Sequence, residues 1–163
     1  MKEFDRKGLN LAGFQGEVFQ KSLARYSISS PIFIRRFMKS ELARKLDWEE
    51  TAFLPLTDEW AFESLDGQFP NKDYGKTKYS EAEMHWIGYI YRYICYTRSE
   101  SSVFVYGYFK PDELRKVYYA YHTQSEEWVI ASLLMSHGLD EGFFDKNKRL
   151  KDSLRDFIKA KQQ

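Results

Sequence analysis

Cysteine and histidine are the residues of this chain that could do nucleophilic chemistry, and the sequence holds one cysteine and three histidines in 163 residues. A thiol nucleophile needs a base within hydrogen-bond reach. Cys95 and His85 lie on one predicted helix, about 15 Å apart at 1.5 Å per residue, so they cannot form a dyad. His122 and His137 could approach Cys95 only through the fold. We therefore predict that Cys95 is a buried, inert thiol.

Metal and phosphate chemistry also lack a pattern in this sequence. Zinc sites draw three or four ligands from characteristic spacings, whereas the histidines here are scattered along the chain. Gly13 and Gly16 lack the preceding strand and the GK[ST] ending of a phosphate-binding loop. We expect no metal and no cofactor, and an enzyme of unrecognised class is the least favoured function.

A basic cluster provides the best argument for nucleic acid: Arg35, Arg36, Lys39, Arg44 and Lys45. The segments PIFIRRFMKS and SELARKLD meet at Ser40 and suggest a helix-turn-helix with a short recognition helix. The turn lacks glycine, and a formal net charge of +1 argues against a general nucleic-acid binder. A helix with Phe33 and Phe37 inward and its arginines outward explains the segment equally well. DNA binding therefore stays open as an alternative.

The element that must position these groups is a predicted aromatic helix from Tyr79 to Arg98. Ser80 and Glu83 form a capping box at its start. Two adjacent apolar rows follow helical spacing: Met84, Ile87, Tyr91, Ile94 and Cys95, and beside them Trp86, Ile90 and Tyr93. A helix that is apolar on most of its surface is enclosed by its neighbours. Gly88 costs about 1 kcal/mol relative to alanine, which predicts that another helix crosses closely there.

The remaining row of this helix is polar-tipped and consists of His85, Tyr89, Arg92 and Tyr96. Together with Tyr118, Tyr119, Tyr121 and His122 it is the candidate protein-binding surface, because tyrosine and arginine are frequent at interface hot spots. With 12 Tyr, 13 Phe and 4 Trp, 18% of the chain is aromatic, so some of these rings are expected at the surface. The alternative is that the tyrosines bridge core helices through their hydroxyl groups.

The whole pattern predicts an all-α chain: a compact single domain over residues 1–163, with six to eight helices around the aromatic helix. Residues 1–8 are expected to be a loose leader and residues 159–163 a frayed tail. The first helix should start near Asn10, the second after Ser30 as its cap, and a later one at a Thr123–Glu126 capping box. Residues 102–109 could be helix or strand, and we choose helix. A last helix from about Asp145 carries Leu150, Leu154, Phe157 and Ile158 on one face.

The expected localisation rests on the absence of a signal peptide or membrane span and on the single cysteine. The N-terminal segment has no apolar core of a signal peptide, and no run approaches the roughly 18 apolar residues of a membrane span. One cysteine suits a reducing compartment. We expect a cytoplasmic protein without a membrane partner.

Three stretches resemble a family of small bacterial proteins of uncharacterised function: SPIFIRRFMKSELARKLD at 30–47, YGKTKYSEAEMHWIGYIYRYICYT at 74–97 and PDELRKVYYAYHT at 111–123. The match covers under half of the chain, which departs from the family pattern after Thr123. Genes of that family tend to sit in toxin–antitoxin-like clusters beside an ADP-ribosyltransferase-like protein. The resemblance implies an antitoxin or accessory subunit that binds and blocks such a partner.

Overall fold

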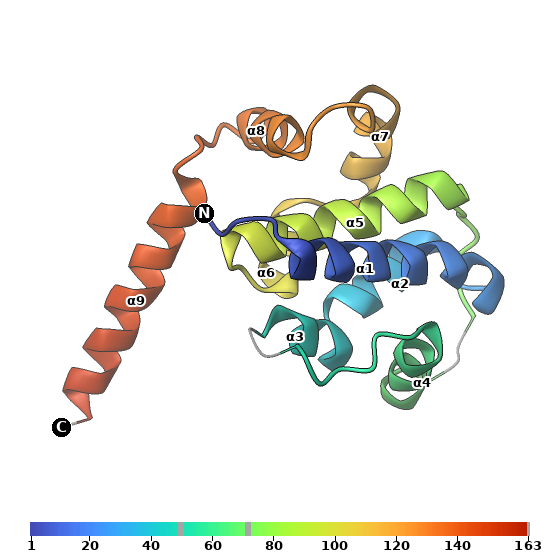
Figure 1. Ribbon diagram of the computed structural model, residues 1–163, viewed down its shortest axis with the longest axis horizontal. Coiled ribbons are helices and arrows are strands. Elements are labelled where there is room, and N and C mark those ends of the chain that lie inside the picture. Colours follow the sequence, from blue (N-terminus) through green and yellow to red (C-terminus); the bar gives the residue numbers. More distant parts are fainter. Residues whose placement is uncertain (49–50, 71–72, 163) are drawn as a thin grey trace. The chain divides into compact units, whose positions relative to one another are not determined.

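The computed structural model describes residues 1–48, 51–70 and 73–162 (Figure 1). Within these ranges the chain forms nine helices and no strand: α1 (Arg6–Arg25), α2 (Ser30–Met38), α3 (Glu41–Asp47), α4 (Asp58–Gln68), α5 (Glu81–Arg98), α6 (Ser102–Tyr108), α7 (Pro111–Tyr121), α8 (Glu126–Ser136) and α9 (Phe143–Lys161). The all-α class is confirmed, with more helices than the six to eight expected. The choice of helix for residues 102–109 is also confirmed.

The chain divides into two compact units, residues 1–124 and residues 125–163. The first contains α1 to α7 and includes the helical bundle that was expected around the aromatic helix. The second contains α8 and α9. That one domain spans the whole length stays a prediction.

The centre of the first unit is the pair α1 and α5, which lie side by side (Figure 1). The capping box at the start of α5 is confirmed, because Ser80 Oγ accepts from Glu83 N at 3.1 Å and Glu83 Oε2 accepts from Ser80 N at 3.4 Å. A Cβ on Gly88 would lie 2.7 Å from Phe19 Cγ and 2.8 Å from the Gln15 carbonyl oxygen. The close helix crossing predicted at Gly88 is therefore the crossing with α1.

Glycines of α1 serve the same contact from the other side. A Cβ on Gly16 would lie 3.0 Å from Nε2 of His85, and one on Gly8 would lie 2.6 Å from Cε1 of Tyr96. The glycines that lower the intrinsic helix propensity of α1 thus let α1 approach one row of α5. This row consists of His85, Tyr89, Arg92 and Tyr96, and we call it the third row.

Residues 1–8 are not a loose leader, which corrects the sequence prediction. Asp5 caps α1, where its carboxylate accepts from Gly8 N at 2.9 Å. The Tyr96 hydroxyl donates to the same carboxylate at 2.7 Å, and Lys2 N donates to the Thr97 carbonyl at 2.7 Å. Tyr96 and Thr97 belong to the far end of α5 and tie the N-terminal residues to it. With Asp5 as its cap, α1 starts at Arg6 rather than near Asn10.

The α2 cap lies one residue earlier than predicted. Ser29 caps α2, while the Ser30 hydroxyl accepts from Tyr79 N at 3.0 Å. The loop before α5 is tied to the same place, because Ser29 N donates to the Tyr74 carbonyl at 3.1 Å and Ser30 N to the Thr77 carbonyl at 2.8 Å. The described part of the segment 70–79 is thus fastened to the start of α2; residues 71 and 72 lie outside the described ones.

In the second unit, α8 is capped by Ser125 and not by Thr123. Val129, Ile130, Leu133 and Leu134 of α8 are buried, and Gly138 ends the segment at φ 68°. The last helix begins at Phe143 and continues to Lys161, so residues 159–161 are helical rather than frayed. Among the described residues, no helix combines the length and hydrophobicity that a bilayer crossing requires.

Candidate functional site

Two of the four residues in the third row of α5 lie inside the protein, which corrects the prediction of surface exposure for these two members of the candidate binding site. Arg92 is 1% exposed and Tyr96 is 8% exposed, while His85 and Tyr89 are half-buried. The row faces α1, where the two glycines described above make room for His85 and Tyr96. Arg92 and Tyr96 therefore offer no surface to a partner.

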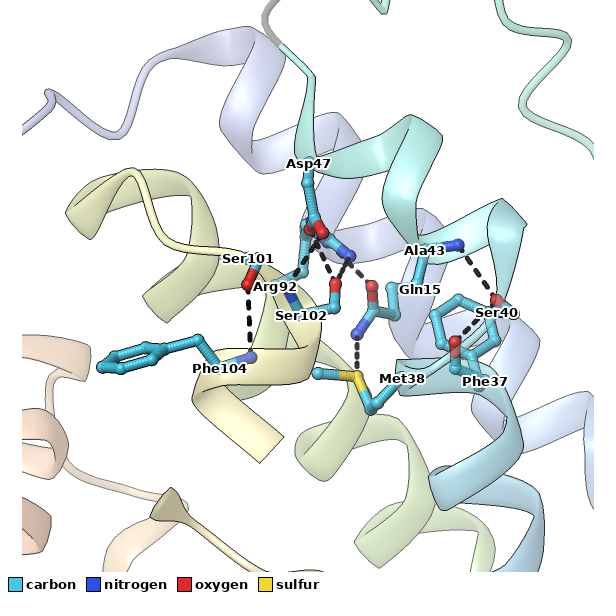
Figure 2. A network of polar contacts seen from close by, with 10 residues as sticks. All are labelled: Gln15, Phe37, Met38, Ser40, Ala43, Asp47, Arg92, Ser101, Ser102 and Phe104. Carbon is cyan, nitrogen blue, oxygen red and sulfur yellow. Dashed lines mark hydrogen bonds and ion pairs between the residues drawn. The ribbon is translucent and has the colours of Figure 1, made fainter. Parts of the chain in front are cut away.

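Arg92 instead forms the centre of a buried polar network (Figure 2). Its Nε donates to Gln15 Oε1 at 2.8 Å, Nη1 to Asp47 Oδ1 at 2.7 Å and Nη2 to Ser102 Oγ at 2.8 Å. The Asp47 carboxylate also accepts from Ser102 N at 2.9 Å and from Ser102 Oγ at 2.6 Å. The network thus joins α1, α3, α5 and α6 at one point.

This arrangement has the burial and the bonding of a structural network. The Arg92 side chain is 1% exposed and that of Asp47 is 11% exposed, and each of the three guanidinium nitrogens has a partner. A buried ion pair whose nitrogen and oxygen atoms are hydrogen-bonded ties its elements together, and removal of one member leaves the other charge uncompensated. A charged residue in an apolar helix predicts a buried partner, but nothing in the sequence distinguishes Asp47 from the other carboxylates.

Cys95 lies beside this network and is buried. Burial raises the pKa of its thiol to about 12, although the Arg92 guanidinium acts in the opposite direction. Cys95 also lines a cavity of about 150 Å³ together with Lys2, Asp47 and Tyr96. A thiol with so high a pKa is protonated at neutral pH and is a poor nucleophile. Among the described residues, no three His, Cys, Asp or Glu side chains cluster as metal ligands would.

The basic cluster on α2 and α3 makes several contacts within the chain. Arg35 Nη2 donates to the Tyr74 hydroxyl at 2.9 Å, and Arg36 lies over the Tyr74 ring at 5.3 Å. Lys39 lies 5.7 Å from the centre of the Tyr106 ring, and Arg44 pairs with Glu41 at 3.0 Å. Arg35, Lys39, Arg44 and Lys45 are exposed, Arg36 is half-buried, and Phe33 and Phe37 are buried. The arginines of α2 thus hold the loop before α5, and α3 is only 7 residues long.

The other predicted residues, Tyr118, Tyr119, Tyr121 and His122, form what we call the α7 aromatic surface. Tyr119 is 88% exposed. Tyr118 stacks on His122 with ring centroids 4.5 Å apart and contacts Trp86 edge-on at 5.7 Å. The Nδ1 atom of His122 lies 2.9 Å from the Tyr118 carbonyl oxygen, which can only accept, so Nδ1 is the donor. Tyr118 and His122 are therefore fixed in place while Tyr119 faces solvent.

The helix that carries this surface is anchored firmly. Leu114 is fully buried, and Arg115 Nε donates to Glu83 Oε2 at 2.9 Å while its guanidinium lies 4.5 Å from the Tyr79 ring centre. Glu83 lies in the first turn of α5, and Tyr79 directly precedes its cap, Ser80. The helix that carries the α7 aromatic surface is accordingly anchored to the start of α5.

The sequence also marked an apolar face on the last helix without showing that it is uncovered. Four side chains of α9 are 52–60% exposed: Leu150, Leu154, Phe157 and Ile158. We call these four residues the α9 stripe. Helical spacing predicts such a face correctly, but it does not tell whether another element covers it.

Comparison with protein-family models, curated proteins and solved structures finds no match to this chain.

Proposed function

We propose that the protein is a non-enzymatic protein-binding module, an antitoxin-type neutraliser or accessory subunit of a bacterial toxin–antitoxin or defence system. The partner we propose is the ADP-ribosyltransferase-like protein implied by the resemblance of residues 30–47, 74–97 and 111–123, and the complex would form in the cytoplasm. The observation that carries the proposal is the α7 aromatic surface, where Tyr119 is 88% exposed on an anchored helix.

The physical support is preorganisation. Tyrosine is among the residues that dominate interface energetics, and a side chain that is already ordered loses less entropy on binding. Tyr118 is held between Trp86 and His122, so the rim around Tyr119 is fixed before a partner arrives. A binding role also agrees with the raised pKa of the buried Cys95 thiol, which leaves the chain without an activated nucleophile there.

The test is co-expression with the product of the adjacent gene, followed by affinity capture and a growth-rescue assay. The wild type should form a complex and restore growth. Tyr119→Ala should raise the dissociation constant at least about tenfold, since hot-spot truncations cost about 2 kcal/mol or more. Tyr108→Ala on α6, where the tyrosine is 38% exposed, is the matched aromatic control and should bind as the wild type does. If the wild type neither binds nor rescues, the proposal is wrong.

A DNA-binding operon regulator is the second candidate, because Arg44 and Lys45 are exposed on α3 directly after the Ser40 turn. A gel-shift assay with the gene's own promoter tests it. Binding should weaken steeply as salt rises and should be lost in Arg44→Ala/Lys45→Ala. A wild type that gives no salt-sensitive shift excludes this function.

A further inference from the structure

The α9 stripe has the shape of a docking element. Its four residues lie at positions i, i+4, i+7 and i+8 and so form one face of the helix. Every residue from 148 to 162 is exposed, and Phe144 is the one buried residue of α9 among those described. The apolar side chains from Leu150 to Ile158 therefore bury little area in the structure of the second unit.

The acidic side chains of α9 lie away from this stripe, while basic side chains lie on both faces of the helix. The helix carries seven basic and three acidic side chains, a net charge of +4, although the whole chain is only +1. Lys151 lies one turn before Leu154, and Arg155 lies one turn before Ile158, so both border the stripe. The three acidic residues occupy the opposite face, since Asp152 follows Leu150 by two positions, roughly 200° around the helix.

A second copy of this chain fits that pattern poorly. Two α9 helices packed stripe to stripe would each bring a charge of +4, and the lysines and arginines at their edges would face one another. Like charges beside an apolar seam disfavour pairing. The charge pattern calls instead for a surface whose rim is acidic.

A membrane surface is also a weaker match than a protein groove. The binding of an interfacial helix grows with its buried apolar area and its attraction to anionic lipid, and here four apolar residues span about two turns. A flat surface contacts one side of the helix. A groove contacts the stripe and also the sides of the helix next to it, so carboxylates on one rim can pair with both Lys151 and Arg155, as in helix-in-groove recognition.

We infer that α9 is a helix-in-groove ligand: its stripe enters an apolar groove on a partner protein, and acidic side chains on the rim of that groove pair with its flanking bases. The inference rests on the part of the proposed function that says the chain acts by binding protein. It names a second contact, separate from the α7 aromatic surface, and the chemistry of the partner that receives it.

The test uses the full chain and calcium-loaded calmodulin as the probe, because that protein opens an apolar groove of acidic character only when calcium is bound. We expect micromolar binding that disappears when calcium is chelated. Leu154→Asp should abolish it. Lys151→Glu should weaken it at least about tenfold, whereas Lys159→Glu, the same charge change on the opposite face, should alter it less than about twofold.

Four outcomes would overturn the inference: no calcium-dependent binding, equal weakening by Lys151→Glu and Lys159→Glu, tighter binding to phosphatidylcholine–phosphatidylglycerol vesicles than to the probe, or a dimer in sedimentation that Leu154→Asp dissociates. The probe needs no native partner, so the two proposals fail separately. Probe binding without capture of the adjacent gene product removes the antitoxin function alone. Capture without probe binding removes the groove ligand alone.

Discussion

The helices α5 and α9 have similar residue patterns, but the side chains of α5 are largely buried and those of α9 are largely exposed. Both carry apolar residues at helical spacing together with arginine or lysine. In α5 even the charged Arg92 is 1% exposed, whereas in α9 Leu150 is 60% exposed. The difference arises outside each helix: α1 brings Gly8 and Gly16 against the third row of α5, while each of the four stripe residues of α9 is more than half exposed. Periodicity shows that a face exists, and a distant segment decides whether it is covered.

Thiol reactivity should show the largest difference between α5 and α9. Because burial raises the Cys95 pKa to about 12, its thiolate fraction at pH 8 should be about a thousandfold below that of a free thiol. Labelling of Ser153→Cys with a chromogenic disulfide should therefore show a fast phase from the exposed α9 position and a very slow one from Cys95. Rising pH should speed the slow phase as it approaches that pKa. A wild type labelled at the free-thiol rate would contradict the burial of Cys95.

Disruption of the polar network around Arg92 should cause the largest loss in the free energy of unfolding. Asp47→Ala leaves the Arg92 guanidinium buried without its carboxylate, and we expect a loss of about 3–5 kcal/mol in urea denaturation. Asp73→Ala, at an exposed loop position, is the control and should change stability by less than about 0.5 kcal/mol. Equal effects of the two substitutions would mean that the network contributes nothing specific.

The crossing of α1 and α5 gives the next largest effect. In Gly88→Ala the new methyl group would meet Phe19 and the Gln15 carbonyl, so overpacking should cost about 1–3 kcal/mol despite the better helix propensity of alanine. Gly13→Ala on α1 has nothing within 4 Å of its Cβ and should instead stabilise by up to about 1 kcal/mol. Thermal melts of both variants decide the point, and a stabilised Gly88→Ala would refute the close crossing.

The α9 stripe should matter least for folding. Leu154 is 52% exposed and Leu114 is 0% exposed. Leu154→Ala should therefore cost less than about 0.5 kcal/mol, whereas Leu114→Ala should cost about 2–5 kcal/mol. Urea denaturation of both variants makes the comparison. A large loss in Leu154→Ala would show that the stripe is packed within the protein rather than presented to a partner.

Local signals predicted the fold well where the deciding contacts are local. The capping box at Ser80 and Glu83 and the caps at Ser40 and Ser101 involve residues within one turn. Caps failed where a distant group competes: the Ser30 hydroxyl is occupied by Tyr79 N, 49 residues away, so Ser29 caps α2. The Asp5 cap also depends on α5, through Tyr96.

The exposure of the candidate binding residues could be predicted only in part for the same reason. Helical spacing placed His85, Tyr89, Arg92 and Tyr96 on one row, but the choice between outer and inner row depends on α1. Tyr119 lies near the end of α7 and is 88% exposed, so it remains a candidate for partner contact, although the sequence did not tell which tyrosines are exposed. The partner of Arg92 could not be read from the sequence, because Asp47 lies 45 residues away.

The pairing of α1 with α5 also imposes an order on synthesis. Fifty-five residues separate Arg25 at the end of α1 from Glu81 at the start of α5. At about 5–20 residues per second, the ribosome needs roughly 3–11 seconds to cross that interval. Phe19 of α1, which lies against Gly88 in the finished protein, must wait that long for its contact with α5. The nascent chain therefore exposes an apolar helix to the translation machinery and its chaperones before its core can close.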